Sequence, residues 1–143
     1  MTNVNSEQSV EIREKWAPVE GIVTPAASAL IVEDRDGLTV TLLFSDIVDG
    51  SHSDLCLKFG RVLAYTVYEE FVHPGPISES APRLAGQWER YCYPLLRISE
   101  SRWIASLPDL LAIHPGAIHY QLVTADQIVD VLGTKPPEVS WTG

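Results

Sequence analysis

The sequence predicts a single β-rich α+β domain, with a mainly antiparallel sheet of about six strands and one or two short helices. Most of its apolar residues fall in short runs rich in β-branched side chains, which are typical of strands. Short turn sequences separate these runs and favour hairpins, hence antiparallel pairing. A chain of 143 residues is also about the size of one domain.

The polar start of the chain carries little that a core could bury. Residues 1–9 are rich in Asn, Ser and Gln, and we expect them to be disordered. The single α+β domain then spans residues 10–143. Within it, Val10–Trp16 is predicted to form one or two helical turns before Pro18 stops them.

A hairpin is the strongest local prediction. The runs Ala29–Val32 and Leu38–Phe44 read as strands, and the pair Asp36-Gly37 between them supplies the positive φ that a tight turn requires. The next run, Leu55–Phe71, alternates apolar and polar residues with period two, which predicts one long strand. Gly60 would mark a bulge or a bend within that strand.

The second half of the chain is predicted to add three strands and a helix. The strands are expected at Tyr93–Ile98, Ala117–Thr124 and Ile128–Leu132. A short helix is expected from about Ser101, because Ser99 and Ser101 offer capping oxygens ahead of apolar residues at helical spacing. Pro136 and Pro137 are expected to end the ordered part of the chain.

The acidic charge is concentrated in one part of the chain. Nineteen Asp and Glu against ten Lys and Arg give a net charge of −9. Because an acidic field repels phosphates, nucleic acid and anionic membranes are disfavoured as partners, whereas basic proteins are favoured. Between Trp16 and Leu57 only Arg35 opposes seven acidic residues, which are Glu20, Glu33, Asp34, Asp36, Asp46, Asp49 and Asp54.

The leading functional hypothesis is a non-enzymatic protein that captures a basic protein partner through its acidic segment Glu33–Asp54. Trp88 lies in a polar run and is the aromatic residue most suited to the binding surface. A simpler interpretation remains, in which the charge only keeps the protein in solution. The expected partner-binding residues are Asp34, Asp36, Asp46, Asp49, Asp54 and Trp88.

The alternative hypothesis is a small enzyme or a ligand- or metal-binding protein with a pocket near His73, His114 and His119. The motif His-Pro-Gly-x-Ile begins at His73 and again at His114, but Pro followed by Gly is also what a type II turn requires. The sequence contains no known catalytic motif, so no catalytic residue, cofactor or metal ligand is assigned.

The sequence also indicates the compartment. Cys56 and Cys92 have apolar or aromatic neighbours and no metal-site or redox spacing, so they are expected to be free, buried thiols. Neither a signal peptide nor a run of ~20 apolar residues is recognisable, which makes the cytoplasm the expected location. Pairing of free sheet edges would allow a homodimer.

The second half of the chain carries a resemblance. The segments Tyr93–Ile104, His119–Thr124 and Ile128–Leu132 resemble small bacterial proteins of unknown function, some of which are immunity proteins of polymorphic toxin systems. The resemblance implies an immunity-like role in binding a toxin. It implies no catalytic residue.

Overall fold

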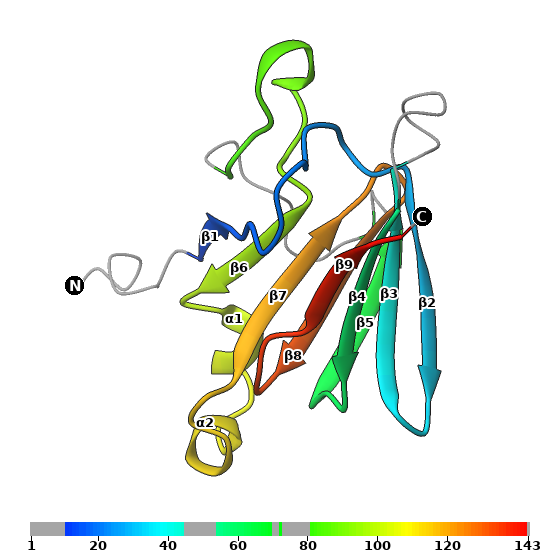
Figure 1. Cartoon of the computed structure of the whole chain (residues 1–143). Helices are drawn as coiled ribbons and strands as arrows, with labels where there is room; N and C mark the ends of the chain where they lie inside the picture. The colour runs from blue at the N-terminus through cyan, green and yellow to red at the C-terminus, as the bar shows by residue number, and fades with distance from the viewer. Residues whose placement is uncertain (1–10, 45–53, 70–71, 73–80, 143) are drawn as a thin grey trace, which may run out of the picture.

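The computed structural model describes residues 11–44, 54–69, 72 and 81–142. In this part of the chain, nine strands form two antiparallel sheets and two short helices lie outside them (Figure 1). The strands are β1 (Ile12–Lys15), β2 (Ser28–Asp34), β3 (Gly37–Leu43), β4 (Leu55–Gly60), β5 (Ala64–Glu69), β6 (Leu95–Ser99), β7 (Ile118–Val123), β8 (Gln127–Gly133) and β9 (Glu138–Trp141). The helices are α1 (Arg102–Ala105) and α2 (Leu110–Ile113), and Gly86–Trp88 forms one 3₁₀ turn, η3.

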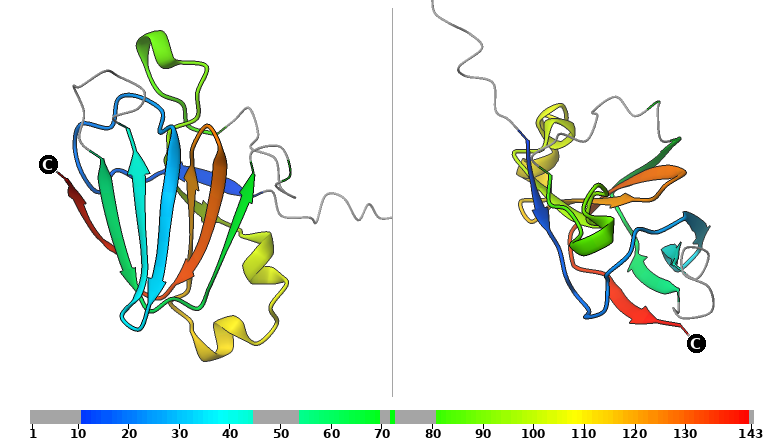
Figure 2. Two further views of the ribbon diagram at one scale, coloured as in Figure 1. Left: turned by 90° about the vertical axis from the view of Figure 1, so that its right-hand side faces the viewer. Right: turned by 90° about the horizontal axis from the view of Figure 1, so that it is seen from above.

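The larger sheet has five strands in the order β1-β6-β7-β8-β5, and the smaller has four in the order β2-β3-β4-β9. The core lies between the sheets. Tyr120 on β7 meets Phe59 on β4 edge to face, with ring centroids 5.5 Å apart. Alternate residues of both sheets, such as Val40 and Val131, point into this core and are fully buried. Figure 2 shows α1 and α2 on the side of the larger sheet that faces away from β2, β3 and β4.

The predicted β-rich, antiparallel domain is therefore confirmed, but it has two sheets in place of the one predicted, and the count of about six strands is wrong. One reason is that the predicted strand Leu55–Phe71 is two strands in different sheets. β4 ends at Gly60, whose φ is +70°, and the chain then crosses to the larger sheet, where β5 begins at Ala64. The alternation of inward and outward side chains keeps the same parity in both strands, because odd-numbered residues such as Leu57 in β4 and Tyr65 in β5 contact the core. Periodicity therefore identified the inward face and missed the change of sheet.

The two ends of the described chain supply further strands. Val10–Trp16 was predicted to be helical, yet Ile12–Lys15 is β1, paired antiparallel with the edge of β6. Pairing with a strand more than eighty residues away outweighs a weak local preference for helix. Pro136 and Pro137 do not end the ordered chain either, because β9 follows directly and pairs with β4. Proline just before a strand costs no ladder hydrogen bond.

The hairpin prediction is confirmed. β2 and β3 pair antiparallel. Their register runs from Ser28 opposite Leu43 to Asp34 opposite Gly37. The positive φ falls on Gly37 (+119°), the first residue of β3, whereas Arg35 and Asp36 in the middle of the turn have negative φ.

In the described part of the chain, no helix has the length and apolar character needed to cross a bilayer.

Candidate functional site

Polar side chains are buried in the middle of two apolar strands. His119 and Gln121 on β7 and Asp130 on β8 expose 4%, 1% and 3% of their surface. They alternate along their strands with core residues such as Tyr120 and Val131, so they lie on the opposite, outer face of the larger sheet. Since burying a polar group is costly unless it is hydrogen-bonded, their partners define the site.

Asp130 is the acceptor at the centre of this group. Its Oδ1 lies 2.7 Å from His119 Nε2 and accepts a hydrogen bond of 3.0 Å from Gln121 Nε2. A carboxylate can only accept, so in the neutral imidazole the proton is on Nε2 and the lone pair is on Nδ1. The ring of Trp103 on α1 packs edge to face against the imidazole, with ring centroids 5.4 Å apart.

Ser101 occupies the other side of the imidazole. Its Oγ lies 2.7 Å from His119 Nδ1 and also accepts a hydrogen bond of 3.1 Å from the backbone N–H of Ile104. The second contact makes Ser101 the N-cap of α1, which confirms the expected helix start. The preceding residue, Glu100, has a φ of +54°, so the chain turns sharply between β6 and α1.

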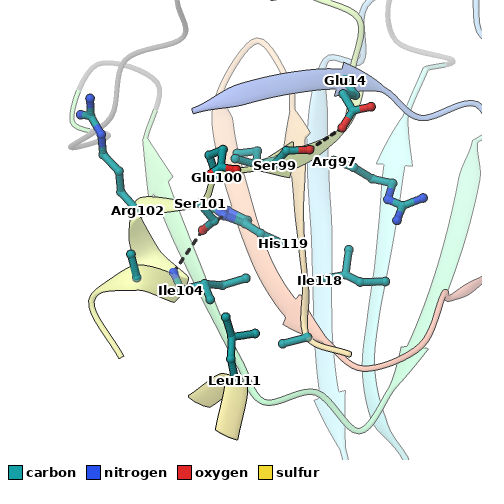
Figure 3. A pocket seen from close by; sticks show the side chains of 13 residues that line it. Glu14, Arg97, Ser99, Glu100, Ser101, Arg102, Ile104, Leu111, Ile118 and His119 are labelled. Atoms are coloured by element: carbon teal, nitrogen blue, oxygen red, sulfur yellow. Dashed lines mark hydrogen bonds between the residues drawn. The ribbon is translucent and has the colours of Figure 1, made fainter. Parts of the chain in front are cut away.

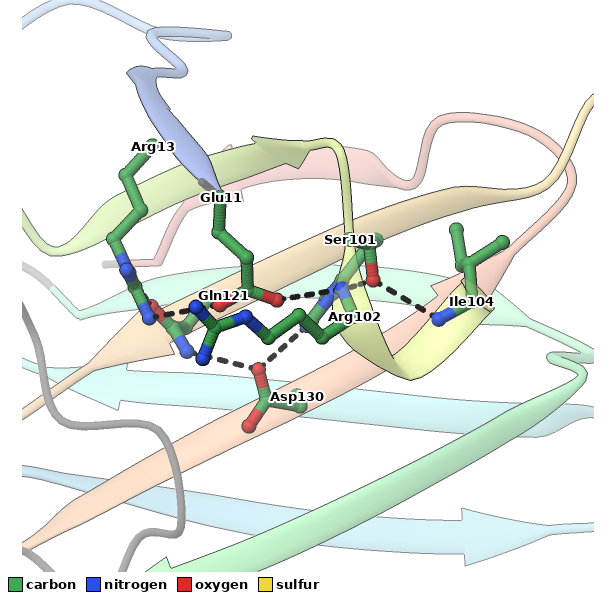
Figure 4. Close-up of polar contacts among 8 residues, drawn as sticks. Glu11, Arg13, Ser101, Arg102, Ile104, Gln121 and Asp130 are labelled. Atoms are coloured by element: carbon green, nitrogen blue, oxygen red, sulfur yellow. Dashed lines mark hydrogen bonds and ion pairs between the residues drawn. The ribbon is translucent and has the colours of Figure 1, made fainter. Parts of the chain in front are cut away.

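Arg13 and Glu11 extend the network across the sheet to β1 (Figure 4). Arg13 Nε donates to Gln121 Oε1 at 2.9 Å, and its guanidinium lies 3.6 Å from Glu11 Oε1. Glu11 Oε2 in turn accepts the backbone N–H of Arg102 at 2.8 Å. The resulting network, Glu11–Arg13–Gln121–Asp130–His119–Ser101, is called here the polar row. It runs from the edge of the larger sheet to the start of α1.

Two cavities open beside the polar row. The larger, of about 660 Å³, is lined by Ser101 and His119 and by residues of β6, α1 and α2 (Figure 3). The smaller, of about 290 Å³, is lined by His119, Gln121 and Asp130 with Thr66 and Tyr68 of β5. His119, Ile98 and Arg102 line both cavities. His119 therefore lies in the walls of two spaces that a small molecule could enter.

The order hydroxyl, imidazole, carboxylate is the order of a serine hydrolase relay, although the two ring nitrogens have exchanged places. Within the described residues, no buried side-chain nitrogen or oxygen lacks a hydrogen-bond partner. A fully satisfied buried network holds its side chains in one arrangement. The polar row is thus preorganised, and its imidazole lone pair faces a hydroxyl at a cavity wall.

The predicted partner-binding acids do not gather in one place. Asp34 and Asp36 are exposed at the turn of the β2–β3 hairpin. Asp54 lies just before β4, at the end of β3 that is farther from the hairpin turn (Figure 1). Its carboxylate accepts a hydrogen bond from the backbone N–H of Phe44 at 3.1 Å. Asp46 and Asp49 lie outside the described residues. Arg61 also reaches the turn and donates to the backbone oxygen of Arg35, so a base lies among the exposed acids.

Trp88 lies apart from the hairpin turn. It belongs to η3, within the segment 81–92 that projects from the end of the molecule opposite that turn (Figure 1). Its ring is half-buried and contacts Tyr91 edge to face, with centroids 5.7 Å apart. The structure therefore does not bring Trp88 together with Asp34 and Asp36.

Of the two predicted histidines whose positions the structure describes, His119 lines the cavities and His114 does not. His114 follows α2, and its backbone oxygen accepts the N–H of Ala117 at 3.1 Å, so the second His-Pro-Gly motif is a turn. It is not the predicted type II turn, because the φ of Gly116 is not positive. His73 lies outside the described residues. Among the residues with described positions, no cluster of three His, Cys, Asp or Glu side chains could hold a metal ion.

The sequence analysis did not identify Arg13, Gln121 or Asp130. One signal was available for Asp130, which is an acid between Val129 and Val131 in an otherwise apolar strand. A carboxylate in such a run is rarely buried without a partner. No local pattern indicated Arg13, because its partner Gln121 is 108 positions away.

Comparison with known proteins adds no relative. No protein-family model, no curated protein and no solved structure matches the chain. The resemblance to immunity-like proteins therefore stays a prediction.

Proposed function

We propose that the protein binds a small organic molecule in the cavities beside His119, as a ligand-binding protein or a small enzyme. The observation that carries this proposal is the polar row, whose buried hydrogen-bonding groups reach two cavities at one imidazole. Cavities of about 300 Å³ or more, with mostly apolar walls and a few convergent polar groups, are typical of small-molecule sites.

The walls indicate the kind of ligand. In the larger cavity, Ile104, Leu111 and Ile118 form an apolar side, and the polar side carries two bases and two acids, which are Arg97, Arg102, Glu14 and Glu100. A molecule with a short apolar part and a carbonyl or carboxyl group matches both. The carbonyl or carboxyl group would lie towards Ser101 and His119.

Backbone NMR of the full chain with a fragment library tests the proposal. We expect small carboxylates and esters to shift the amide signals around His119, and Leu111→Trp to abolish those shifts by filling the larger cavity. Ile113→Trp is the matched control, because Ile113 lies on the same helix, is 69% exposed and lines neither cavity. If no fragment shifts these signals, or if both tryptophan variants behave alike, the proposal is wrong.

Capture of a basic protein partner is the second candidate function. The observation that favours it is the exposed, acidic β2–β3 turn beside β2, an edge strand on which Leu30 and Val32 are each more than half exposed. Unpaired edge strands are common sites of protein association. The charge of Asp34 and Asp36 would then speed the encounter and select basic partners.

Cross-linking mass spectrometry in the source cells tests this candidate. Carboxyl-to-amine cross-links from the hairpin turn to lysines of one basic protein are expected, and Asp34→Asn with Asp36→Asn should weaken them at least several-fold. Asp109→Asn is a suitable control, since Asp109 is an exposed acid beside α2. Equal cross-linking by all variants would exclude capture through the turn.

A further inference from the structure

We infer that Ser101 is a nucleophile and that the site hydrolyses carboxylic esters with a short apolar acyl group. This inference rests on the proposed small-molecule site and specifies its chemistry. It starts from Ser101 Oγ and Asp130 Oδ1, which lie 2.7 Å from the two nitrogens of the His119 ring.

The hydrogen bonds of Ser101 leave its oxygen able to react. A serine hydroxyl has one proton to donate and two lone pairs. The proton points to the His119 Nδ1 lone pair, and one lone pair of the oxygen accepts the N–H of Ile104. One lone pair remains for attack. The N–H of Ile104 stabilises negative charge as it develops on the oxygen.

Asp130 makes His119 a base. Its carboxylate accepts a hydrogen bond from the Nε2–H group and so fixes the tautomer whose lone pair faces Ser101. When Nδ1 takes a proton, the ring becomes an imidazolium next to a carboxylate that Gln121 also orients. The low polarity of the surroundings strengthens this pairing.

The larger cavity gives an ester access to Ser101. Ser101 and His119 lie in its wall, and Ile104, Leu111 and Ile118 form an apolar surface for an acyl chain. Arg97 and Arg102 also line this cavity, and Glu14 and Glu100 balance their charge. An aliphatic ester of a few carbons matches these walls better than a charged peptide.

The reaction balances with water as the co-reactant. Ser101 Oγ forms a bond to the carbonyl carbon while its proton moves to His119 Nδ1. The tetrahedral intermediate expels the alkoxide, which takes the proton from Nδ1 and leaves as the alcohol. Water then attacks the acyl-serine, His119 removes its proton, and Ser101 regains that proton as the carboxylic acid leaves.

A fluorophosphonate probe and 4-nitrophenyl butyrate test the inference on the full chain. We expect the probe to add one mass increment to Ser101, located by peptide mass spectrometry, and the ester to release 4-nitrophenolate. Ser101→Ala should lower both rates at least about 100-fold. Ser106→Ala is the matched control, because Ser106 is an exposed hydroxyl at the other end of α1.

Ser101→Gly guards against a folding artefact. Glycine at an N-cap costs only a few tenths of a kcal/mol relative to serine, so this variant keeps the helix start and lacks the hydroxyl. Labelling or hydrolysis that persists in Ser101→Gly would overturn the inference. So would an unlabelled, inactive native protein whose amide signals around His119 still shift with fragments, a result that leaves the small-molecule site standing. Absence of both shifts and labelling would remove the site as well.

Discussion

The Cα of Gly37 lies directly against the backbone of Gly60: a Cβ built on Gly37 would lie 2.0 Å from the carbonyl carbon of Gly60. Gly37 begins β3 after the hairpin turn, and Gly60 ends β4 where the chain leaves the smaller sheet. This contact allows the hairpin turn and the crossing between sheets to lie side by side. It is the closest approach recorded for any described glycine.

Gly37→Ala is therefore expected to destabilise the protein by about 3 kcal/mol or more. The new methyl group would meet backbone atoms, and alanine at a φ of +119° is itself strained. Gly60→Ala is the control, because Gly60 has a φ of +70° with no atom within 4 Å of a built Cβ, and about 1–2 kcal/mol of strain is expected there. Denaturant unfolding measures both. Equal costs would contradict the contact.

Asp130→Ala should lower the free energy of unfolding by about 3 kcal/mol. The change leaves the Nε2 donors of His119 and Gln121 without their shared acceptor in a buried site, and each orphaned donor costs about 1–3 kcal/mol. Asp126→Ala, in the exposed turn before β8, should change stability by less than about 0.5 kcal/mol. A cost below about 1 kcal/mol for Asp130→Ala would show that the polar row is not formed in solution.

Glu33→Gln should lower the pKa of Tyr65. The Tyr65 hydroxyl on β5 donates to Glu33 Oε1 on β2 at 2.9 Å, which joins the edge strands of the two sheets. This hydrogen bond raises the pKa of Tyr65 above its usual value, and burial and the charge of Glu33 add to the rise. The neutral amide removes the charge and weakens the acceptor. NMR titration of the tyrosine ring carbons measures the pKa, with Tyr65→Phe identifying the signal.

The Cys92 thiol should make stability fall with pH in the alkaline range. Burial raises the pKa of Cys92 from 9.0 to about 11, partly opposed by the charges of Arg13 and Arg83. Between about pH 9 and 11 the unfolded chain releases the thiol proton while the folded chain keeps it, so ionisation favours the unfolded state. The free energy of unfolding should decline less steeply there for Cys92→Ala than for the native protein. Parallel declines would contradict the raised pKa.

Much of the fold could be predicted from local patterns. The hairpin at Asp36-Gly37 and the capping serine at the start of α1 are short-range features, and the structure confirms both. The inward face of β4 and β5 was also readable, because period two marks which side chains point to a core. The two cysteines are free, as expected, but each is only partly buried.

The candidate site could be predicted only in part. His119 was named among three histidines, whereas its partners Ser101 and Asp130 lie 18 and 11 positions away on other elements. Such contacts depend on which strands pair and in what register. Alternation within one strand does not contain that information.

The sequence by itself thus determined the class of the fold, the hairpin turn and the inward faces of the strands. Each of these features depends on residues that are close together in the sequence. Only the tertiary structure decided that the chain changes sheets after Gly60, that β1 and β9 are strands, and that Arg13, Gln121, Asp130, His119 and Ser101 form one row. The physical reason is that a buried polar side chain is held by whichever partner the pairing brings within hydrogen-bonding distance. In this protein, most of those partners are distant in the sequence.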